Sequence, residues 1–430
     1  MNVFVLPSWY PSAAQPMAGL FVRDQARAVA LVRPSWNVIV GTWGHHDGAL
    51  ALRDAAASLR ALHWRLREPR GWREAGAPPH EVLTPRLSWT LALAGGGARG
   101  LLRASLANLR AAEKRFGRMH LLHAHVAFPA GWIAARIARQ HGYRYVLTEH
   151  MSPFPFPSLR DRDGAPNAAV REAFAGASAT VAVSRSLAAT IRAVGLPCSD
   201  VLPNVVDESR FPLAAAAPGP QHFTFFTLAS LVPRKGVGVL LQALARMRHS
   251  DVLLKIGGEG PERAALQAQC AQLGLGQRVR FIGALRPDQV PQQHAASDAF
   301  VLASFEETFG VVLVEALMSG RPVVATRCGG PEDIVHEGNG WLVPPGDPAA
   351  LAEAMDQAVE RPGRHGAGTL RPRAGGLFED AAGLSEEARL TEHGARLSND
   401  AAALREDAVK RFCRSAVGGS LAVLYERVLA

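Results

Sequence analysis

The sequence predicts an α/β protein made of two tandem, Rossmann-like doubly wound domains that face each other across a cleft. Short apolar runs alternate with longer amphipathic runs, which is typical of parallel strands joined by crossover helices. This alternation restarts after residues 212–221, a segment rich in Ala, Pro and Gly that we interpret as a linker. A length of 430 residues also exceeds what one hydrophobic core usually organises.

Each half of the chain has its own set of predicted elements. In the first half we expect strands at 2–7, 36–43, 120–126, 143–150, 179–184 and 200–206, and helices at 19–32, 130–142, 169–178 and 185–195. In the second half we expect strands at 222–229, 251–258, 278–285, 299–304, 322–326 and 340–344, and helices at 236–247, 261–274 and 311–318.

We place a first domain at 1–214 and a second domain at 221–403. Residues 361–402 fit neither pattern and are interpreted as an atypical insertion, and the helices expected in 404–430 are predicted to cross back to the first domain. Since ligands of such sheets bind at the carboxyl ends of the strands, two facing sheets would offer two ligand sites.

The composition is that of an ordinary globular protein, with 48% hydrophobic and 20% charged residues. The four cysteines lie far apart in the sequence and form no Cys/His cluster, so neither a disulfide framework nor a zinc site is indicated. No apolar run approaches the roughly 20 residues that span a bilayer. We therefore expect a cytoplasmic protein, with peripheral contact at the inner face of the membrane as a further hypothesis.

That hypothesis rests on an uneven charge. Residues 1–210 contain 25 Lys and Arg against 14 Asp and Glu, whereas the remainder contains 22 against 24. Within 99–120, Leu102, Leu106 and Leu109 recur at helical spacing. The basic residues around them are Arg103, Arg110, Lys114, Arg115 and Arg118. A basic amphipathic helix binds anionic membrane surfaces, but an apolar face packed on the first sheet explains the pattern equally well.

Two motifs match known binding-site patterns, but we do not expect either of them to form the corresponding site. Residues 95–100, GGGARG, match the dinucleotide pattern G-x-G-x-x-G, but the next predicted strand ends in His125 and not in an acidic residue, so we expect a flexible turn. His123 and His125 have the spacing of metal ligands. We expect their side chains on opposite faces of the strand, and therefore no shared metal ion.

Two glutamates, Glu307 and Glu315, flank the start of the helix predicted at 311–318. Backbone N–H groups at a helix N-terminus attract anions, and Gly310 permits close approach, so this segment predicts a phosphate cradle. Glu315 could accept hydrogen bonds from ribose hydroxyls, and Glu307 from those of a sugar ring. A glycosidase pair of carboxylates and a Glu315 satisfied by a local partner remain alternatives.

Cations follow the first strand of the second half. In SLVPRKG, residues 230–236, Arg234 and Lys235 stand at a strand's carboxyl end, in a chain with only four lysines. Such cations complement a diphosphate leaving group without a metal. After the next strand, Gly258 and Gly260 form a glycine-rich turn.

Together these segments resemble the retaining GT-B glycosyltransferases of glycosyltransferase family 4. The second half is similar nearly throughout, in LVPRKG, GGEGPERAAL, RVRFIGAL, EETFGVVLVEALMSGRPVVAT and GGPEDIVHEGNGWLVPPGD. The first half is similar more loosely, in SWYPSAAQPMAGLFVRDQARAVA, LLHAHVAFPAGWIAARIA, YVLTEH and VLPNVVD. The resemblance covers about 1–360 and 404–430 and leaves 361–402 without a counterpart.

The resemblance implies roles on the donor side. Arg234 and Lys235 bind the donor diphosphate, and Glu315 holds the ribose. Glu307 and the backbone of Phe309, Gly310 and Val311 hold the transferred sugar, beside the turn of Gly258 and Gly260. One residue departs from the family pattern, because Ser230 stands where an Arg is common. The second cation would then come from Arg234.

On the first-domain side, the resemblance implies that Gly19 lets a loop approach the phosphate or the acceptor. It places His150 beside the sugar, as a catalytic residue with Lys235, Arg234 and Glu307, and Asn204 near the hinge or the acceptor. From the residues alone, His150 equally fits a structural role at the end of a strand.

The resemblance implies a metal-independent enzyme with no cofactor, which moves a sugar from a nucleotide-diphosphate sugar with retention of configuration. The acceptor is expected to be a polysaccharide, a lipopolysaccharide or a lipid-linked glycan, as in exopolysaccharide and cell-envelope biosynthesis, and no nucleic-acid partner is expected. Alternatives are a sugar-nucleotide epimerase on the same fold and a catalytically silent subunit that binds sugar nucleotide, for which Ser230 is the one supporting feature.

Overall fold

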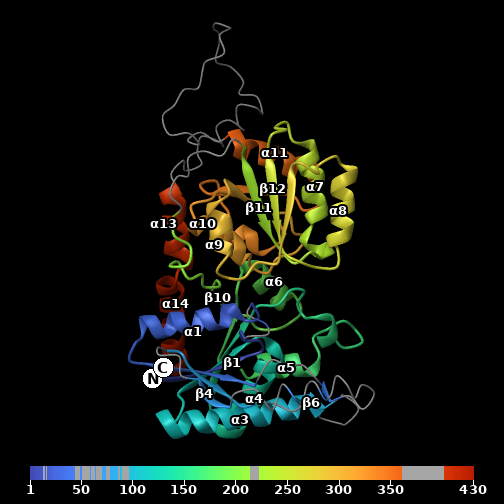
Figure 1. Cartoon of the computed structure of the whole chain (residues 1–430). Helices are drawn as coiled ribbons and strands as arrows, with labels where there is room; N and C mark the ends of the chain where they lie inside the picture. The colour runs from blue at the N-terminus through green and yellow to red at the C-terminus, as the bar shows by residue number, and fades with distance from the viewer. Residues whose placement is uncertain are drawn as a thin grey trace, which may run out of the picture. The chain divides into compact units, whose positions relative to one another are not determined.

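The computed structural model describes residues 1–430 apart from 13, 14, 16, 44–48, 51–58, 60–62, 64–69, 74–77, 86, 87, 90–95, 214–221 and 361–400. Most of the predicted linker and insertion therefore lies outside the described residues. The chain divides into two compact units, Met1–Asp207 with Arg411–Ala430, and Glu208–Lys410. Each unit has its own sheet flanked by helices (Figure 1), so the predicted pair of α/β domains is confirmed.

The first unit is built on a sheet with strand order β10-β9-β8-β7-β1-β2-β5-β4. Its strands are β1 (Asn2–Pro7), β2 (Asn37–Thr42), β4 (Gly71–Arg73), β5 (His80–Leu83), β7 (Leu121–His125), β8 (Arg144–Glu149), β9 (Ala179–Ala182) and β10 (Asp200–Val201). They run parallel except for β4, which pairs antiparallel with β5 at the edge. A separate parallel pair joins β3 (Ala49–Leu50) and β6 (Ser88–Trp89). The strand order reverses between β1 and β7, where the following loops diverge.

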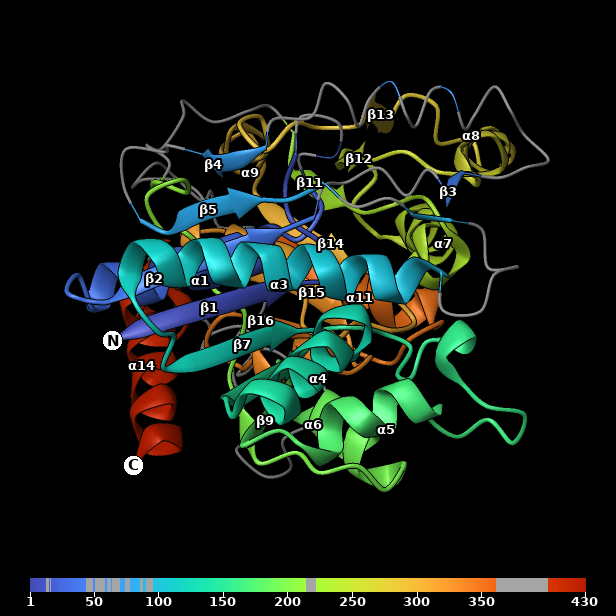
Figure 2. The ribbon, with the colours of Figure 1, turned by 90° about the horizontal axis from the view of Figure 1, so that it is seen from below.

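Helices cover both faces of this sheet (Figures 1 and 2). The helices are α1 (Leu20–Val32), α3 (Gly96–Phe116), α4 (Trp132–His141), α5 (Ala168–Ala175), α6 (Arg185–Ala193) and α14 (Arg414–Leu429). Helices α1 and α14 pack together and share one apolar cluster with β1, β2 and β7. Gly418 makes this contact close, because a Cβ there would lie 2.5 Å from the carbonyl oxygen of Ala28.

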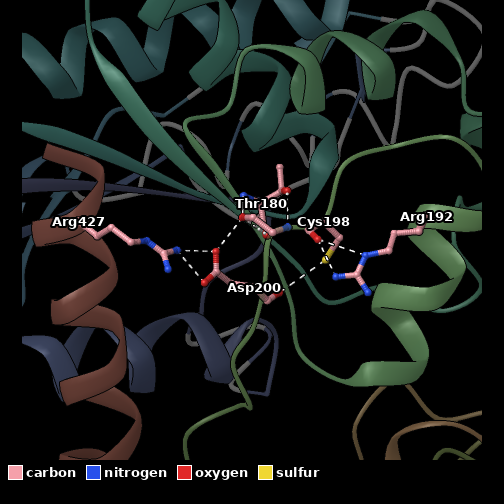
Figure 3. Close-up of polar contacts among 6 residues, drawn as sticks. Thr180, Arg192, Cys198, Asp200 and Arg427 are labelled. Atoms are coloured by element: carbon pink, nitrogen blue, oxygen red, sulfur yellow. Dashed lines mark hydrogen bonds and ion pairs between the residues drawn. The ribbon is translucent and has the colours of Figure 1, made fainter. Parts of the chain in front are cut away.

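The C-terminal end of α14 also makes polar contacts with β10. Figure 3 shows Arg427 extending from the helix to Asp200, whose two carboxylate oxygens lie 2.7 and 2.6 Å from the guanidinium. Cys198 donates from its Sγ to the Asp200 carbonyl oxygen over 3.5 Å. Because the Arg427 side chain is 60% exposed, the ion pair adds little stability. The apolar contacts with α1 therefore hold the helix in place.

Helix α3 packs its apolar face on the sheet. Leu101, Ala104, Leu109 and Ala112 are buried, and the helix contacts β1, β2 and β5. Leu102 and Leu106 are half-buried, whereas the basic residues named above are exposed. Most of the apolar face is thus occupied within the unit, and what α3 presents to solvent is charge.

The second unit has an all-parallel sheet with order β13-β12-β11-β14-β15-β16. Its strands are β11 (Thr224–Leu228), β12 (Leu253–Gly257), β13 (Val279–Gly283), β14 (Ala299–Leu302), β15 (Val323–Thr326) and β16 (Gly340–Val343). Its helices are α7 (Val237–Arg246), α8 (Arg263–Gln272), α9 (Val290–Ala295), α10 (Val311–Met318) and α11 (Pro348–Glu360), and α13 (Ala401–Phe412) ends past the unit boundary. The order reverses between β11 and β14.

Three local predictions are wrong. The strand expected at 200–206 pairs only at Asp200–Val201, because Pro203 has no N–H to donate to a ladder. The turn expected at 95–100 is helical from Gly96 onward, since the following residues bury an apolar face that outweighs the low helix propensity of glycine. His123 and His125 lie on one face of β7 with ring centroids 4.1 Å apart, because residues two apart in a strand share a face.

Candidate active site

The strand-order reversal in the second unit brings four loops to one edge of the sheet. These loops follow β11, β12, β14 and β15 and contain residues 229–236, 258–262, 303–310 and 327–330. The carboxyl ends of parallel strands meet at this edge, where ligands of doubly wound sheets bind. All of the predicted donor-side residues except Val311 and Glu315 lie in these loops, and those two lie in the first turns of α10.

Lys235 and Glu307 form an ion pair at this edge. The Lys235 ammonium contacts Glu307 Oε1, and Ser304 donates from its hydroxyl to the same oxygen over 2.9 Å. The two charged side chains are only 15% and 12% exposed. Ser304 was not singled out by sequence reasoning. Its position at the end of a buried strand, three residues before Glu307, is the signal that could have identified it.

The backbone holds both partners of this pair in place. Phe305 N–H donates to the Arg234 carbonyl oxygen over 2.8 Å, which joins the two loops. Glu307 N–H donates to Cys328 O over 3.0 Å, and Gly330 N–H donates to Glu307 O over 2.8 Å. The segment carrying Glu307 is therefore bonded like a short strand on both sides, and the carboxylate does not depend on a flexible loop for its position.

Gly236 allows the lysine loop to lie close to β14. Its φ is 63°, and a Cβ there would lie 2.0 Å from the Ala303 carbonyl oxygen. Only glycine accepts both conditions. Gly258 and Gly260 lie in the same way against the backbone of Ala229 and Leu231, so the two glycine-rich loops pack on each other.

Helix α10 begins at Val311, with Gly310 as its N-cap residue in the left-handed region. The N-terminal N–H groups of this helix point to the edge that carries Lys235 and Glu307, as an anion cradle requires. Phe309 is buried, and Glu315 is half-buried within the helix. The Arg234 and Ser230 side chains are exposed at the same edge.

Cys328 is the cysteine beside this pair. Burial, with a smaller contribution from the carboxylates of Glu307 and Glu332, raises the pKa of its thiol to about 12, although Thr326 and Lys235 act in the opposite direction. The thiol is therefore protonated at neutral pH and is a poor nucleophile. The charged pair remains the chemically distinctive feature of the edge.

The edge of the first unit carries buried histidines instead. His150 follows β8, is 8% exposed, and packs against Phe21 with ring centroids 4.2 Å apart and the rings tilted by 31°. Its Nε2 lies 3.0 Å from His125 Nδ1. Burial lowers the pKa of His150 to about 3, so the ring is uncharged at neutral pH. The bond from His125 was not predicted, because we placed His123 and His125 on opposite faces of the strand.

Glu149, which sequence reasoning also missed, organises the backbone around His150. Its carboxylate accepts from the N–H groups of Ala127, His150 and Met151 over 2.8–2.9 Å. Burial raises the pKa of Glu149, and these three bonds oppose the shift. A buried acid directly before a histidine at a strand end was the available signal.

Val126 and Gly19 are strained or crowded positions at this edge. Val126 has φ 77°, which is a genuine outlier for a β-branched residue and is typical of functional sites. Gly19 has φ 65°, and a Cβ there would lie 2.1 Å from Trp9 O. The structure thus explains Gly19 by crowding within its own loop. Asn204 is buried in the first unit.

Comparison with known proteins gives two family matches in sequence order. The glycosyltransferase family 4 model matches residues 69–210, and the model for glycosyl transferases group 1 matches residues 215–368. Each half of the chain therefore matches a glycosyltransferase family. The group 1 match contains every donor-side residue named above, from Ser230 to Glu315.

Curated relatives of this chain align over part of their length. A lipopolysaccharide core biosynthesis glycosyltransferase, LpsE of Rhizobium meliloti, is 36% identical over 36% of this chain and 43% of its own. A phosphatidylinositol N-acetylglucosaminyltransferase component from Arabidopsis thaliana is 27% identical over 56% and 55%. Glycogen synthase of Mycobacterium tuberculosis is 29% identical over 67% and 71%. The aligned region thus spans about half the length of the first two relatives.

Solved structures share the fold of this chain over its whole length. Sucrose-phosphate synthase from Thermosynechococcus elongatus has a TM-score of 0.68 at 19% identity and covers 100% of this chain and 99% of its own. HepE from Anabaena, in complex with UDP and glucose, has a TM-score of 0.65 at 20% identity and covers 99% of both. Across residues that the structure describes, no helix is long and apolar enough to cross a membrane.

Proposed function

We propose that this chain is a metal-independent, retaining glycosyltransferase that uses a nucleotide-diphosphate sugar and no cofactor. The observation that carries the proposal is the Lys235–Glu307 pair, held by Ser304 and the backbone at the strand-order reversal of the second unit. A half-buried ammonium stabilises a departing diphosphate, since charge interactions strengthen where water is excluded. Glu307 then accepts hydrogen bonds from the sugar hydroxyls, and Glu315 accepts them from the ribose hydroxyls.

In the proposed front-side transfer, the bond between the anomeric carbon and the diphosphate oxygen breaks. The acceptor oxygen bonds to the same face of that carbon, and its proton passes to the departing phosphate. No enzyme nucleophile is needed. Arg234 adds the second cation that Ser230 cannot supply. The neutral His150 contributes a hydrogen bond to the sugar, because its low pKa prevents it from carrying charge.

The relatives support an envelope glycan or a lipid-linked glycan as the acceptor. LpsE is named for lipopolysaccharide core biosynthesis, and a further relative, from Mycolicibacterium smegmatis, is named for GDP-mannose-dependent transfer to a phosphatidylinositol mannoside. The HepE structure contains UDP. We therefore propose UDP- and GDP-sugars as the first donors to test. Gly19 is proposed near the donor phosphate or the acceptor, and Asn204 near the hinge or the acceptor.

Two measurements test the proposal. A thermal-shift panel of UDP-, GDP-, ADP- and dTDP-sugars identifies the donor, because a ligand bound to the folded state raises its stability. Nucleotide release is then followed with and without candidate acceptors. We expect release that depends on acceptor. Epimerised donor without release indicates an epimerase, and a thermal shift with neither product indicates a silent binding subunit.

A further inference from the structure

Three histidines form a connected buried cluster at the carboxyl edge of β7 and β8. His123 Nδ1 lies 2.5 Å from the hydroxyl of Tyr425 on α14, and His123 Nε2 lies 2.8 Å from Thr148 Oγ1. The rings of His123 and His125 are in contact at a tilt of 40°, and His125 Nδ1 lies 3.0 Å from His150 Nε2. In the described part of the chain, no group of three or more His, Cys, Asp or Glu side chains is placed to hold a metal ion.

Two buried polar atoms beside this cluster have no hydrogen-bond partner. They are His150 Nδ1 and Asn204 Oδ1. A side-chain hydrogen-bond interaction with Asn204 opposes the lowering of the His150 pKa by burial, so the two side chains are adjacent, although neither atom has a partner with full hydrogen-bond geometry. Buried polar groups are normally satisfied, so an adjacent unpaired donor site and acceptor site point to a group supplied from outside the chain.

The hydrogen bond between two neutral rings couples their tautomers. Burial lowers the pKa of both His125 and His150, so neither ring carries two protons at neutral pH. One nitrogen of the bonded pair must therefore donate while the other accepts. The acceptor oxygen of Asn204 stabilises a proton on His150 Nδ1. His150 Nε2 then has a lone pair, and His125 Nδ1–H donates to it.

We propose that His125 is a positioning residue, which holds His150 as its Nδ1–H tautomer and leaves that N–H, together with Asn204 Oδ1, to bind one ligand hydroxyl group. A single hydroxyl satisfies both atoms, since it accepts from the N–H and donates to the amide oxygen. The identity of the ligand, a sugar or glycan hydroxyl, rests on the proposed function. The tautomer of His150 does not rest on the proposed function.

Paired substitutions at His125 separate the hydrogen bond from packing. The amide nitrogen of Asn lies near the position of an imidazole Nδ1, whereas that of Gln lies near Nε2. Both changes remove the ring. We expect His125→Gln to lower kcat on the order of tenfold with a smaller change in donor KM, and His125→Asn to stay within about threefold of wild type. Equal losses in the two variants would overturn the proposal.

His123→Asn is the matched control. His123 is equally buried, two residues earlier on the same strand and face, and makes no hydrogen bond to His150. It is expected to lower the unfolding temperature like the His125 variants while kcat changes less than in His125→Gln. If His123→Asn lowered kcat as much as His125→Gln does, the loss of kcat would be due to packing alone.

Nitrogen NMR of the 15N-histidine-labelled full chain tests the tautomer without donor or acceptor. We expect His125 and His150 each to show a protonated Nδ1 and a bare Nε2, with the His150 signals assigned from their loss in His150→Asn. The His150 pattern should change in His125→Gln and persist in His125→Asn. A protonated Nε2 on His150 overturns the proposal even if transfer occurs, and the expected tautomers without any transfer contradict the proposed function alone.

Discussion

The carboxyl edge of the sheet carries a charged pair of side chains in the second unit and uncharged histidines in the first. At the edge of the second unit, Lys235 and Glu307 form an ion pair although both side chains are largely buried. At the edge of the first unit, His125 and His150 are buried without a charged partner and remain neutral. The difference fits the two tasks that we propose, stabilisation of a departing diphosphate in the second unit and orientation of uncharged hydroxyls in the first.

Lowering the pH should destabilise the first unit more than the second. This difference in stability should exceed the effect of any single substitution. His123, His125 and His150 have folded-state pKa values far below 6.5, so below pH 6.5 the unfolded chain binds protons that the folded unit does not. Stability is therefore fully present above about pH 6.5 and is lost as the pH falls, by roughly 1.4 kcal/mol per pH unit for each histidine. Glu149, whose pKa is raised, offsets part of this loss.

In the second unit, His294 is the fully buried histidine with a comparably lowered pKa among the described residues. Hydrogen exchange at pH 7 and pH 5 measures the difference directly. Protection of β7 and β8 should fall well before that of β11 and β14. Equal loss in both units would mean that the histidine cluster is charged or hydrated in the folded protein.

Removal of Lys235 tests the charged edge. Because its interaction with the diphosphate strengthens as the sugar bond breaks, Lys235→Ala should lower kcat by on the order of 100-fold or more and affect donor binding less. Steady-state nucleotide release measures this. Lys255→Ala is the matched control, since Lys255 lies on β12 of the same unit and donates to Ala296 O. Loss of wild-type activity in EDTA would show that a metal supplies this charge.

Glu315→Gln should have a more moderate effect, on binding. A neutral amide accepts weaker hydrogen bonds from ribose hydroxyls than a carboxylate does, so the donor dissociation constant should rise by about tenfold, or on the order of 1.5–3 kcal/mol. Calorimetric titration of the donor measures it, with Glu353→Gln on the exposed side of α11 as the control. Wild-type affinity in Glu315→Gln would remove this residue from the donor site.

The smallest effect is expected at the surface of the first unit. Since most of the apolar face of α3 packs on the sheet, any membrane contact would be electrostatic, would require anionic lipid, and would weaken as salt shortens the screening length to about 3 Å at 1 M. Replacement of Arg110, Lys114, Arg115 and Arg118 with Gln should cut vesicle sedimentation several-fold and leave donor affinity intact.

The matched control removes four exposed arginines of the second unit, Arg246, Arg248, Arg280 and Arg286. It should leave sedimentation unchanged. Equal sedimentation of the wild type with neutral and anionic vesicles would end the membrane hypothesis and leave an acceptor in solution as the default.

Local sequence information was sufficient for most of the second unit. The strand at 299–302, the cap at Gly310 and the helix from Val311 all follow from apolar periodicity and from the conformational freedom of glycine, which act over a few residues. The Lys235 and Glu307 segments could be placed at one edge because strands of a parallel sheet end on the same side.

Tertiary structure decided what those side chains contact. Residues 72 positions apart make the Lys235–Glu307 pair, and Tyr425 reaches His123 from 302 positions away. No periodicity encodes such distances, because they depend on strand order and helix packing. The neutrality of the histidines has the same origin, since a pKa responds to burial and to neighbours that only the folded chain assembles. The sequence by itself thus determined the fold class and the residues at the strand ends, and the fold determined which of them are charged and which atoms remain for a ligand.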